Sequence, residues 1–460
     1  MKSYRLGLSL FLLPLLGFAL RAGTENSERE VTYSKDVAPI LYKSCVICHH
    51  ANDIAPMSLM TYKEVRPWAM SIREKVVQRT MPPWHADPKV GEFLNDPRLS
   101  DTEIETIRKW VNTGAKEGNP KDLPPAPVFQ DGWHIKPDVV LTIPEFVVSA
   151  GNQDDYEFFF VPTNFTEDKW VQAAEVLPGD RRVVHHADAL VVSGDKASET
   201  QEKVSKRFEP GANKYLYSTG RVRHVKPDAP IADDGCSMPE GGGPPGGSSG
   251  TEKIEPAIYL PGHLAETRPA GYAIRIPAGS YMMFAVHYSN RLGEAVKDRT
   301  SLGLVFAKEP VKHEMAEYDV ENMLFKIPSN DENHRVTSCY TLPKDGIAVA
   351  LTAHMHYRGK SMMTEAIYPD GRRETLMNVP HYDFRWQETY FLKHQFLLPK
   401  GTKLVTTAYF DNSVNNPLNP DPSKTIRFGE PSDEEMMGFW LHFADPRLVE
   451  TKTVTTEAKH

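Results

Sequence analysis

The stretch YMMFAVHY, residues 281–288, decides how most of this chain is built. Apolar and aromatic residues dominate it and the turn-forming residues 277–280 precede it, so it predicts a β-strand that follows a hairpin turn. Further short β-rich runs, separated by turn residues, lie at 139–143, 156–161, 272–276, 347–352, 363–368 and 404–410. This spacing is typical of β-sandwiches, and about 320 residues suffice for two of them.

Ahead of the β-rich part, residues 31–118 have a helical pattern. Ser34 is expected to cap the first helix, which carries an i, i+3, i+4 apolar stripe. Ser100 and Glu103 form a capping box ahead of a later helix. A stiff Pro-rich linker is expected to follow at 119–130.

The helical part contains the sequence CVICH at residues 45–49. This is the attachment signature of c-type haem, in which Cys45 and Cys48 form thioethers and His49 binds the iron. Met81 precedes two prolines, which would hold a rigid extended loop able to present its thioether to iron. It is our candidate for the distal ligand, because a Met and His pair suits electron transfer. Four other residues compete for that role: Met57, Met60, Met70 and His85.

The N-terminus resembles a secretory signal. Lys2 and Arg5 precede an apolar run at 6–20, and small residues follow, so we expect cleavage after a signal peptide at 1–22. An uncleaved anchor is the alternative, although the run is short for a bilayer span of about 20 residues. The prediction is a periplasmic or secreted protein without stable membrane insertion after cleavage.

The amino-acid composition limits the classes of partner that this protein can bind. The chain has 53 Lys and Arg against 61 Asp and Glu, a net charge of -8, which leaves no basic patch for nucleic acid. Two of the four cysteines belong to the haem motif. The other two, Cys236 and Cys339, form either a disulfide or two thiols in an oxidising compartment, and both alternatives stay open.

These observations predict a multidomain protein: an N-terminal all-α cytochrome c-like domain followed by two all-β, jelly-roll-like β-sandwich domains. The predicted segments are a signal peptide at 1–22, a haem domain at 31–118, a linker at 119–130, β-sandwiches at 131–310 and 311–448, and a C-terminal tail at 449–460.

Several histidines have spacings that suit metal binding. His354 and His356 project from one face of a strand, so both can bind one ion. Adjacent residues face opposite sides of a regular strand, so His185 and His186 can share an ion only where the backbone bulges or leaves the sheet. With 17 histidines in the chain, either pattern alone has a core or surface role as its alternative.

Taken together, the ordered motifs resemble a known family. Residues from about 130 to 447 are similar to the copper type II, ascorbate-dependent monooxygenases, the family of peptidylglycine alpha-hydroxylating monooxygenase and dopamine beta-monooxygenase. The shared motifs are His185-His186, His287-Tyr288, His354-Met355-His356 and Asp433-Glu434-Glu435-Met436.

The resemblance implies two copper ions. The first would be held by His185, His186 and His287, and the second, catalytic one by His354, His356 and Met436. Three imidazoles tolerate both copper oxidation states, whereas two imidazoles with a thioether favour Cu(I). Met437 is the rival of Met436, because a slip of one residue exchanges their faces.

Two departures from the family pattern concern the substrate. Peptide-hydroxylating members grip the substrate carboxylate with an arginine and a tyrosine, at the positions of Thr352 and Trp440 in this sequence. Threonine cannot replace the charge of an arginine fork. A glycine-extended peptide is therefore excluded as the expected substrate, and Trp440 favours an apolar ligand or is ordinary sandwich core.

The resulting hypothesis is an O2-dependent copper monooxygenase that hydroxylates a C–H bond of a small or apolar substrate. The fused haem c, itself reduced by a periplasmic electron donor, would supply electrons. The alternative is a periplasmic electron-transfer or copper-binding multidomain cytochrome without oxygenase activity. A third interpretation makes the β-domains purely structural, docking the cytochrome to a larger redox complex.

Overall fold

The computed structural model describes residues 29–51, 55–129, 132–151, 155–205, 250–260, 265–290, 292–322, 325–429 and 432–448. The predicted signal peptide at 1–22, the tail at 449–460 and Cys236 lie outside these residues. Cys339 is disulfide-bonded. Among the helices in these ranges, none is both long and apolar enough to cross a bilayer.

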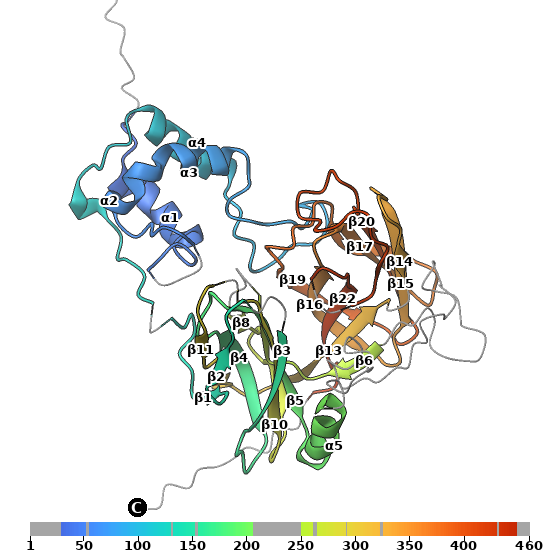
Figure 1. The fold of residues 1–460 in the computed structure, drawn as a ribbon. Coiled ribbons are helices and arrows are strands. Elements are labelled where there is room, and N and C mark those ends of the chain that lie inside the picture. Colours follow the sequence, from blue (N-terminus) through green and yellow to red (C-terminus); the bar gives the residue numbers. More distant parts are fainter. Residues whose placement is uncertain are drawn as a thin grey trace, which may run out of the picture.

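Helices occupy the segment before the β-rich part (Figure 1). Their apolar faces meet in one core, at whose centre Trp110, Ile107 and Leu41 are fully buried. The helices are η1 Tyr33–Val37, α1 Ala38–Ser44, α2 Tyr62–Val65, η2 Arg66–Trp68, α3 Ala69–Val77, α4 Asp101–Asn112 and η3 Pro120–Asp122.

The two predicted helix caps differ in outcome. At α4 the capping box is confirmed, since Ser100 accepts from the Glu103 N–H and the Glu103 carboxylate accepts from the Ser100 N–H at 2.8 Å. The Ser34 cap was wrong, because the helical turn begins two residues earlier, after Thr32. The Asp36 carboxylate accepts from the Thr32 N–H at 2.8 Å, which fixes that earlier start.

The remainder is mostly β-sheet, consistent with the predicted β-sandwiches, and we divide it into two units. The first β unit also carries helix α5, Gly194–Ser205, after β5. Its strands are β1 Val139–Thr142, β2 Phe146–Val148, β3 Asp155–Pro162, β4 Lys169–Leu177, β5 Val184–Val192, β7 Ala257–Tyr259, β8 Glu266–Thr267, β9 Tyr272–Ile276, β10 Tyr281–Tyr288, β11 Val296–Asp298 and β12 Ser301–Phe306.

The second β unit contains the strands that lie toward the C-terminus and one earlier strand, β6, which pairs with β13. Its strands are β6 Gly250–Lys253, β13 His313–Glu321, β14 Lys326–Ile327, β15 His334–Thr341, β16 Gly346–Met355, β17 Gly359–Ile367, β18 Arg373–Val379, β19 Thr389–Leu398, β20 Lys403–Phe410, β21 Ile426–Arg427 and β22 Met437–Ala444.

One sheet is shared by both units. Strands β1, β12, β4 and β9 of the first unit continue into β13, β22, β16 and β19 of the second, through a short parallel pairing of β9 with β13. A four-stranded sheet, β3-β10-β5-β7, belongs to the first unit, and another, β15-β20-β17-β18, belongs to the second. Each unit has its own large apolar cluster. In Figure 1, strand β4, in green, and strands β13, β16 and β22, in orange to red, belong to this shared sheet.

All of the predicted β-rich runs coincide with strands. Residues 272–276 and 281–288 have the predicted bounds, as β9 and β10. The other runs are extended or trimmed at their ends, as where 347–352 becomes β16 at Gly346–Met355. The domain boundaries at 130 and 310 stay predictions.

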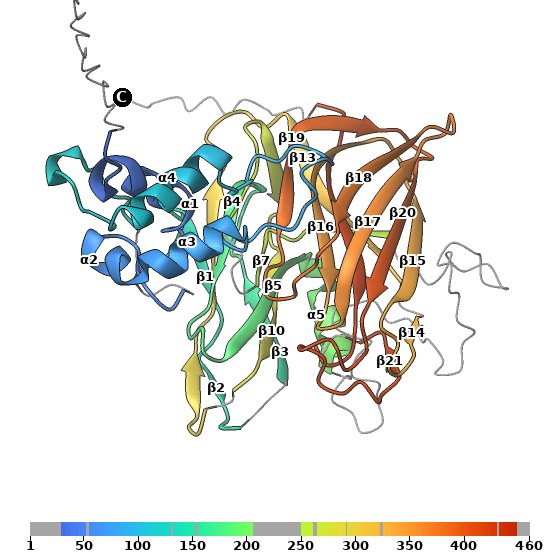
Figure 2. The ribbon, with the colours of Figure 1, turned by 90° about the horizontal axis from the view of Figure 1, so that it is seen from above.

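The helical segment contacts both β units (Figure 2). Toward the first unit, His134 Nε2 lies 3.3 Å from the carbonyl oxygen of Ile47, inside the CVICH sequence. Toward the second, the Leu94 N–H donates to the Phe391 carbonyl at 2.7 Å, next to a bridge between Phe93 and Leu392. Both contacts tie the segment that carries the cysteines to the β-sheets.

Candidate metal centre

A β-bulge brings adjacent histidines onto one side of β5. Strand β10 pairs His287 with His186 and then Tyr288 with Val184, which leaves His185 as an extra residue. An extra residue interrupts the alternation of a strand, so two successive side chains can face the same way. The bulge predicted for this pair is confirmed.

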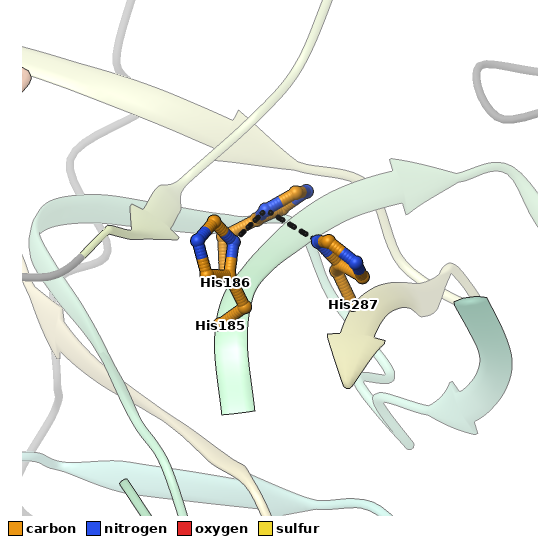
Figure 3. Close-up of side chains that lie close together, drawn as sticks. All are labelled: His185, His186 and His287. Atoms are coloured by element: carbon orange, nitrogen blue, oxygen red, sulfur yellow. Dashed lines mark hydrogen bonds between the residues drawn. The ribbon is translucent and has the colours of Figure 1, made fainter. Parts of the chain in front are cut away.

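The side chains of His185, His186 and His287 point toward one another (Figure 3). His186 Nδ1 lies 3.2 Å from His185 Nδ1 and 3.3 Å from His287 Nδ1. One ring nitrogen from each residue lies within 4.8 Å of the others. An ion with metal–nitrogen bonds of about 2.0 Å in tetrahedral geometry holds its ligands ~3.3 Å apart. The three imidazoles therefore fit a metal of the zinc or copper type.

Burial keeps the imidazole of His186 neutral. It lowers the pKa of His186 well below the usual range of histidine, and the neighbouring histidines, first His287 and His185 and then His356 and His354, lower it further. A neutral imidazole has a free lone pair for a metal. The same interactions show that the second histidine pair lies close to the first group.

The second pair, His354 and His356, stands at the end of β16. Their ring centroids are 5.2 Å apart. Strand β22 pairs Gly438 with His354 and Met437 with Met355, and paired residues share a face of the sheet. Met355 and Met437 are fully buried in the apolar core, so the histidines face the other way.

Each imidazole of this pair is prepared differently for binding. His354 Nδ1 lies 2.6 Å from Gln387 Oε1, so this nitrogen carries the proton and Nε2 is left as an acceptor. Burial lowers the pKa of His354 to about 4. In the described part of the chain, His356 Nδ1 is buried and has no hydrogen-bond partner. A buried nitrogen of this kind is what a metal ion would satisfy.

Glu435 fixes the strand end against the segment that carries Met436. Its fully buried carboxylate accepts from the N–H groups of His356 at 2.8 Å and Arg358 at 2.6 Å. Burial raises the pKa of Glu435 to about 8, against the opposing effect of the Arg358, His356 and Met436 N–H groups. The backbone N–H of Met436 interacts with the same carboxylate, and Met436 is half-buried, one residue before the fully buried Met437.

One aromatic ring lies between the two histidine groups. The centroid of Phe384 is 5.7 Å from that of His185, with the rings nearly parallel at 19°. It is 5.8 Å from His356 at 84°. Phe384 is buried and contacts one imidazole of each group.

Phe384 also forms part of the wall of a cavity of about 490 Å³. Its exposed rim includes Lys360, His381 and Arg385, while Phe384 is the buried part of the lining. The full lining is Tyr357, Gly359, Lys360, His381, Tyr382, Asp383, Phe384, Arg385, Asp411, Asn415, Asn416, Pro417 and Leu418. A small molecule in this cavity would be one side chain away from both histidine groups.

The sequence analysis missed the polar neighbours of these groups. Gln387 and Phe384 lie in a loop without a recognisable motif. Glu317, Asp319 and Glu321 alternate along β13, opposite His442, Trp440 and Gly438 of β22. Because side chains alternate with a period of two, these acidic residues lie on the same face of the sheet as the histidines. The alternation was readable in the sequence, but nothing there linked β13 to β22.

The residues of the CVICH sequence are close together at the end of α1. Cys45 follows the last residue of α1, and its burial, with Cys48 and Glu103, raises the pKa of its thiol to about 12. His49 Nδ1 lies 3.2 Å from the Met57 carbonyl, which leaves Nε2 as the acceptor. Met57 and Met60 pack against the helical core, Met70 is 59% exposed, and Met81 is half-buried.

Residues 327–459 match the family model of the copper type II ascorbate-dependent monooxygenase, C-terminal domain. The match contains His354, His356 and Met436, and supports a copper-dependent oxidoreductase of that family. No curated protein matches the chain.

Among solved structures, three from viruses have distant similarity to this chain. The major capsid protein P2 from bacteriophage PM2 is 7% identical, with a TM-score of 0.28 over 68% of this chain and 98% of that chain. The structure of broad bean stain virus is 8% identical, with a TM-score of 0.24 over 68% of this chain and 89% of that chain. The infectious bursal disease virus VP2 subviral particle is 8% identical, with a TM-score of 0.15 over 70% of this chain and 73% of that chain. Such low TM-scores carry no argument about fold or function.

The Glu435 carboxylate should be required for the stability of the second β unit. Glu435→Leu leaves buried N–H groups without acceptors, so we expect the free energy of unfolding to fall by about 2–5 kcal/mol. Glu434→Leu, at the half-buried neighbouring position, is the control and should change it by less than about 1 kcal/mol. Urea denaturation followed by circular dichroism measures both, and equal stability of the two variants would contradict the assignment.

Proposed function

We propose that this protein is a copper monooxygenase that uses O2 to hydroxylate a C–H bond of a small or apolar substrate, with electrons supplied by an N-terminal haem c. The observation that carries the proposal is the convergence of three imidazole nitrogens at a β-bulge, close to a second histidine pair. The family match over residues 327–459 supports the same chemistry.

The two copper sites we propose have different ligand sets. His185, His186 and His287 would hold the first ion. When bound, copper supplies one-electron redox chemistry, and a thioether ligand favours the Cu(I) state. The second ion, at which O2 would react, would be held by His354, His356 and Met436.

Strand alternation favours Met436 over Met437 as the thioether ligand. Met437 is fully buried and pairs with Met355 on the core side of the sheet. Met436 is one residue earlier and is tied to the His356 strand end through Glu435. A soft ligand is thus available beside His356 at no cost to the core.

The substrate would approach through the cavity beside Phe384. Its volume of about 490 Å³ suits a small molecule. Thr352, at the position of the family's carboxylate-binding arginine, is buried and hydrogen-bonded to His442 at 3.1 Å. Trp440 stacks on His354 with ring centroids 5.0 Å apart. These contacts support a substrate without a clamped carboxylate.

The helical segment would carry haem c on Cys45 and Cys48, with His49 as the proximal ligand and Met81 as the distal one. The hydrogen bond of His49 Nδ1 supports this, because it directs Nε2 outward as a ligand requires. Haem at this position supplies one-electron transfer. The contact of Ile47 with His134 keeps the segment against the first β unit, which contains the first histidine group.

This assignment implies an oxidising compartment, since haem c attachment and the Cys339 disulfide both suit one. We propose a periplasmic or secreted location, with an external electron donor. O2 and a small-molecule substrate would be the other partners.

The choice of thioether ligand can be tested by metal analysis. Met436→Ile should lower the copper content from two ions per chain to one, and reduce O2-dependent product formation by roughly 100-fold or more. Met437→Leu, a volume-conserving change in the core, is the matched control and should retain both ions. Copper loss in the control with full loading of Met436→Ile would reverse the assignment.

The electron path can be tested without knowing the substrate. Reduction of the haem in the anaerobic, copper-loaded protein should lower the Cu(II) resonance in electron paramagnetic spectra by one copper ion for each electron that the haem delivers, because the helical segment contacts the first β unit. A variant with Cys45→Ala and Cys48→Ala, which cannot attach haem, should keep that resonance. Persistent Cu(II) beside reduced haem would exclude the relay. An electron carrier without oxygenase activity would pass this test but yield no product.

A further inference from the structure

The histidine face of the second β unit holds a buried ionic cluster that the proposed function does not use. Lys253 Nζ of β6 lies 2.5 Å from Glu255 Oε2, 2.9 Å from Glu317 Oε1 and 3.4 Å from Asp319 Oδ1. All three carboxylates are more than nine-tenths buried. Burying ionic groups is costly, and replacing such a cluster by apolar residues is often stabilising. Its presence beside the candidate site is therefore poorly explained by stability alone.

The cluster continues as a line of hydrogen-bonded groups. Glu317 Oε2 lies 3.2 Å from His442 Nδ1. On the other side of that ring, His442 Nε2 lies 3.1 Å from Thr352 Oγ1. Thr352 Oγ1 in turn lies 3.0 Å from Thr389 Oγ1. We call the groups from Glu255 through Lys253, Glu317 and His442 to Thr352 the buried polar chain.

The chain ends beside the proposed oxygen site. Thr352 is two residues before His354 on the same face of β16. Thr389 is two residues after Gln387, which hydrogen-bonds His354. The other end reaches Glu255, whose charge interacts with Asp188 of the first β unit. Imidazole and hydroxyl groups in such a line can each accept a proton on one side and donate one on the other.

Three carboxylates and one ammonium cannot all remain ionised in so dry a place. Burial raises the pKa of Glu317 well above its usual range, against the opposing charge of Lys253, and Asp319 and Glu255 raise it further. Burial opposes the charge of Lys253, but the carboxylates of Asp319, Glu255 and Glu317 outweigh it and raise its pKa. The guanidinium of Arg268 also interacts with Glu317. The cluster therefore retains a carboxylic acid proton near neutral pH.

We propose that the buried polar chain stores protons and passes them, through His442 and Thr352, to the oxygen chemistry beside His354. The inference rests on the proposed function, whose reaction RH + O2 + 2e⁻ + 2H⁺ → ROH + H2O consumes two protons. The O–O bond breaks, one oxygen atom enters the C–H bond, and the other leaves as water. The electrons come from the external donor through the haem. In one transfer, His442 gives its Nε2 proton toward Thr352 and gains one at Nδ1 from Glu317. Before the second transfer, the His442 proton returns to Nε2 and Glu317 takes up a new proton from solvent.

The relay also accounts for threonine at position 352. An arginine there would place a guanidinium beside His442, where the chain needs a hydroxyl that accepts and donates in turn. The substitution would thus trade a carboxylate clamp for a proton path. Glu317, Lys253 and His442 are positioning and relay residues in this scheme, because they act through Thr352.

The first test is infrared spectroscopy on the metal-free, full-length protein. The C=O stretch of buried, protonated carboxylic acids should be present at neutral pH and shift in heavy water, and Glu317→Gln should remove the Glu317 component while that of Glu435 remains. Glu314→Gln is the matched control, since Glu314 lies on the opposite face of β13 and pairs with Arg275 at 2.9 Å. A spectrum unchanged by Glu317→Gln would overturn the storage of a proton at this position.

The second test uses dioxygen as the probe, with ascorbate as reductant and no organic substrate. Reduction of O2 by the copper-loaded protein, O2 + 2e⁻ + 2H⁺ → H2O2, also consumes two protons. Glu317→Gln should slow it on the order of 100-fold, raise its solvent isotope effect, and leave the copper content unchanged. The rate of O2 reduction by the wild-type protein should fall as pH rises through the raised pKa of Glu317. The rate of Glu317→Gln should not show this fall.

Two further variants keep the test decisive. His442→Gln should reproduce the slower rate, and Glu317→Asp should restore part of it, which a merely structural role would not require. Wild-type rates in Glu317→Gln and His442→Gln would overturn the relay alone. A wild-type protein that loads copper but consumes no O2 would overturn the proposed function, and the relay with it.

Discussion

The structure depends on one constraint: ionisable groups on a sheet face that is covered by another β unit must satisfy one another. In β13, β22 and β16 the alternation of side chains sends one set into an apolar core and the other toward the first β unit. Burying a polar group without a partner costs several kcal/mol. His354, Gln387 and the carboxylates around Lys253 therefore form a polar layer on this face, in which Gln387 fixes the orientation of His354, while His356 Nδ1 has no hydrogen-bond partner among the described residues.

A single segment, residues 250–260, joins this layer to the first histidine group. Its first strand, β6, pairs with β13 and contributes Lys253, while its last strand, β7, pairs with β5 at Ala187 and Asp188. Trp440 packs against Ile258 and Leu260 of the same segment. The relative position of the two histidine groups is thus set by local strand pairing. The ring of Phe384 contacts one histidine of each group.

How far the sequence could predict this arrangement depends on the range of each interaction. Period-two runs gave β9 and β10 with correct bounds, and the opposite facing of adjacent strand residues was enough to require the bulge at His185. Glu435, Gln387 and Phe384 were not recognised, because their roles depend on loops and pairings distant in sequence. The Ser34 cap failed for a local reason, since Asp36 stabilises an earlier start.

The same face of the sheet explains why the site can combine metal ligands with proton-bearing groups. Cross-strand neighbours share a face, so each acidic residue of β13 lies opposite a residue of β22, which in turn lies opposite one of β16. Gly438 lies between Glu321 and His354 in the sheet, and Trp440 lies between Asp319 and Thr352. Trp440, stacked on His354 and 4.8 Å from Lys253 Nζ, separates the ligand end of this face from its ionic end. The charge of Lys253 lowers the pKa of His354 in addition to its burial, and so helps to keep that imidazole neutral for a metal, while the hydroxyl of Thr352 lets a proton pass at its side.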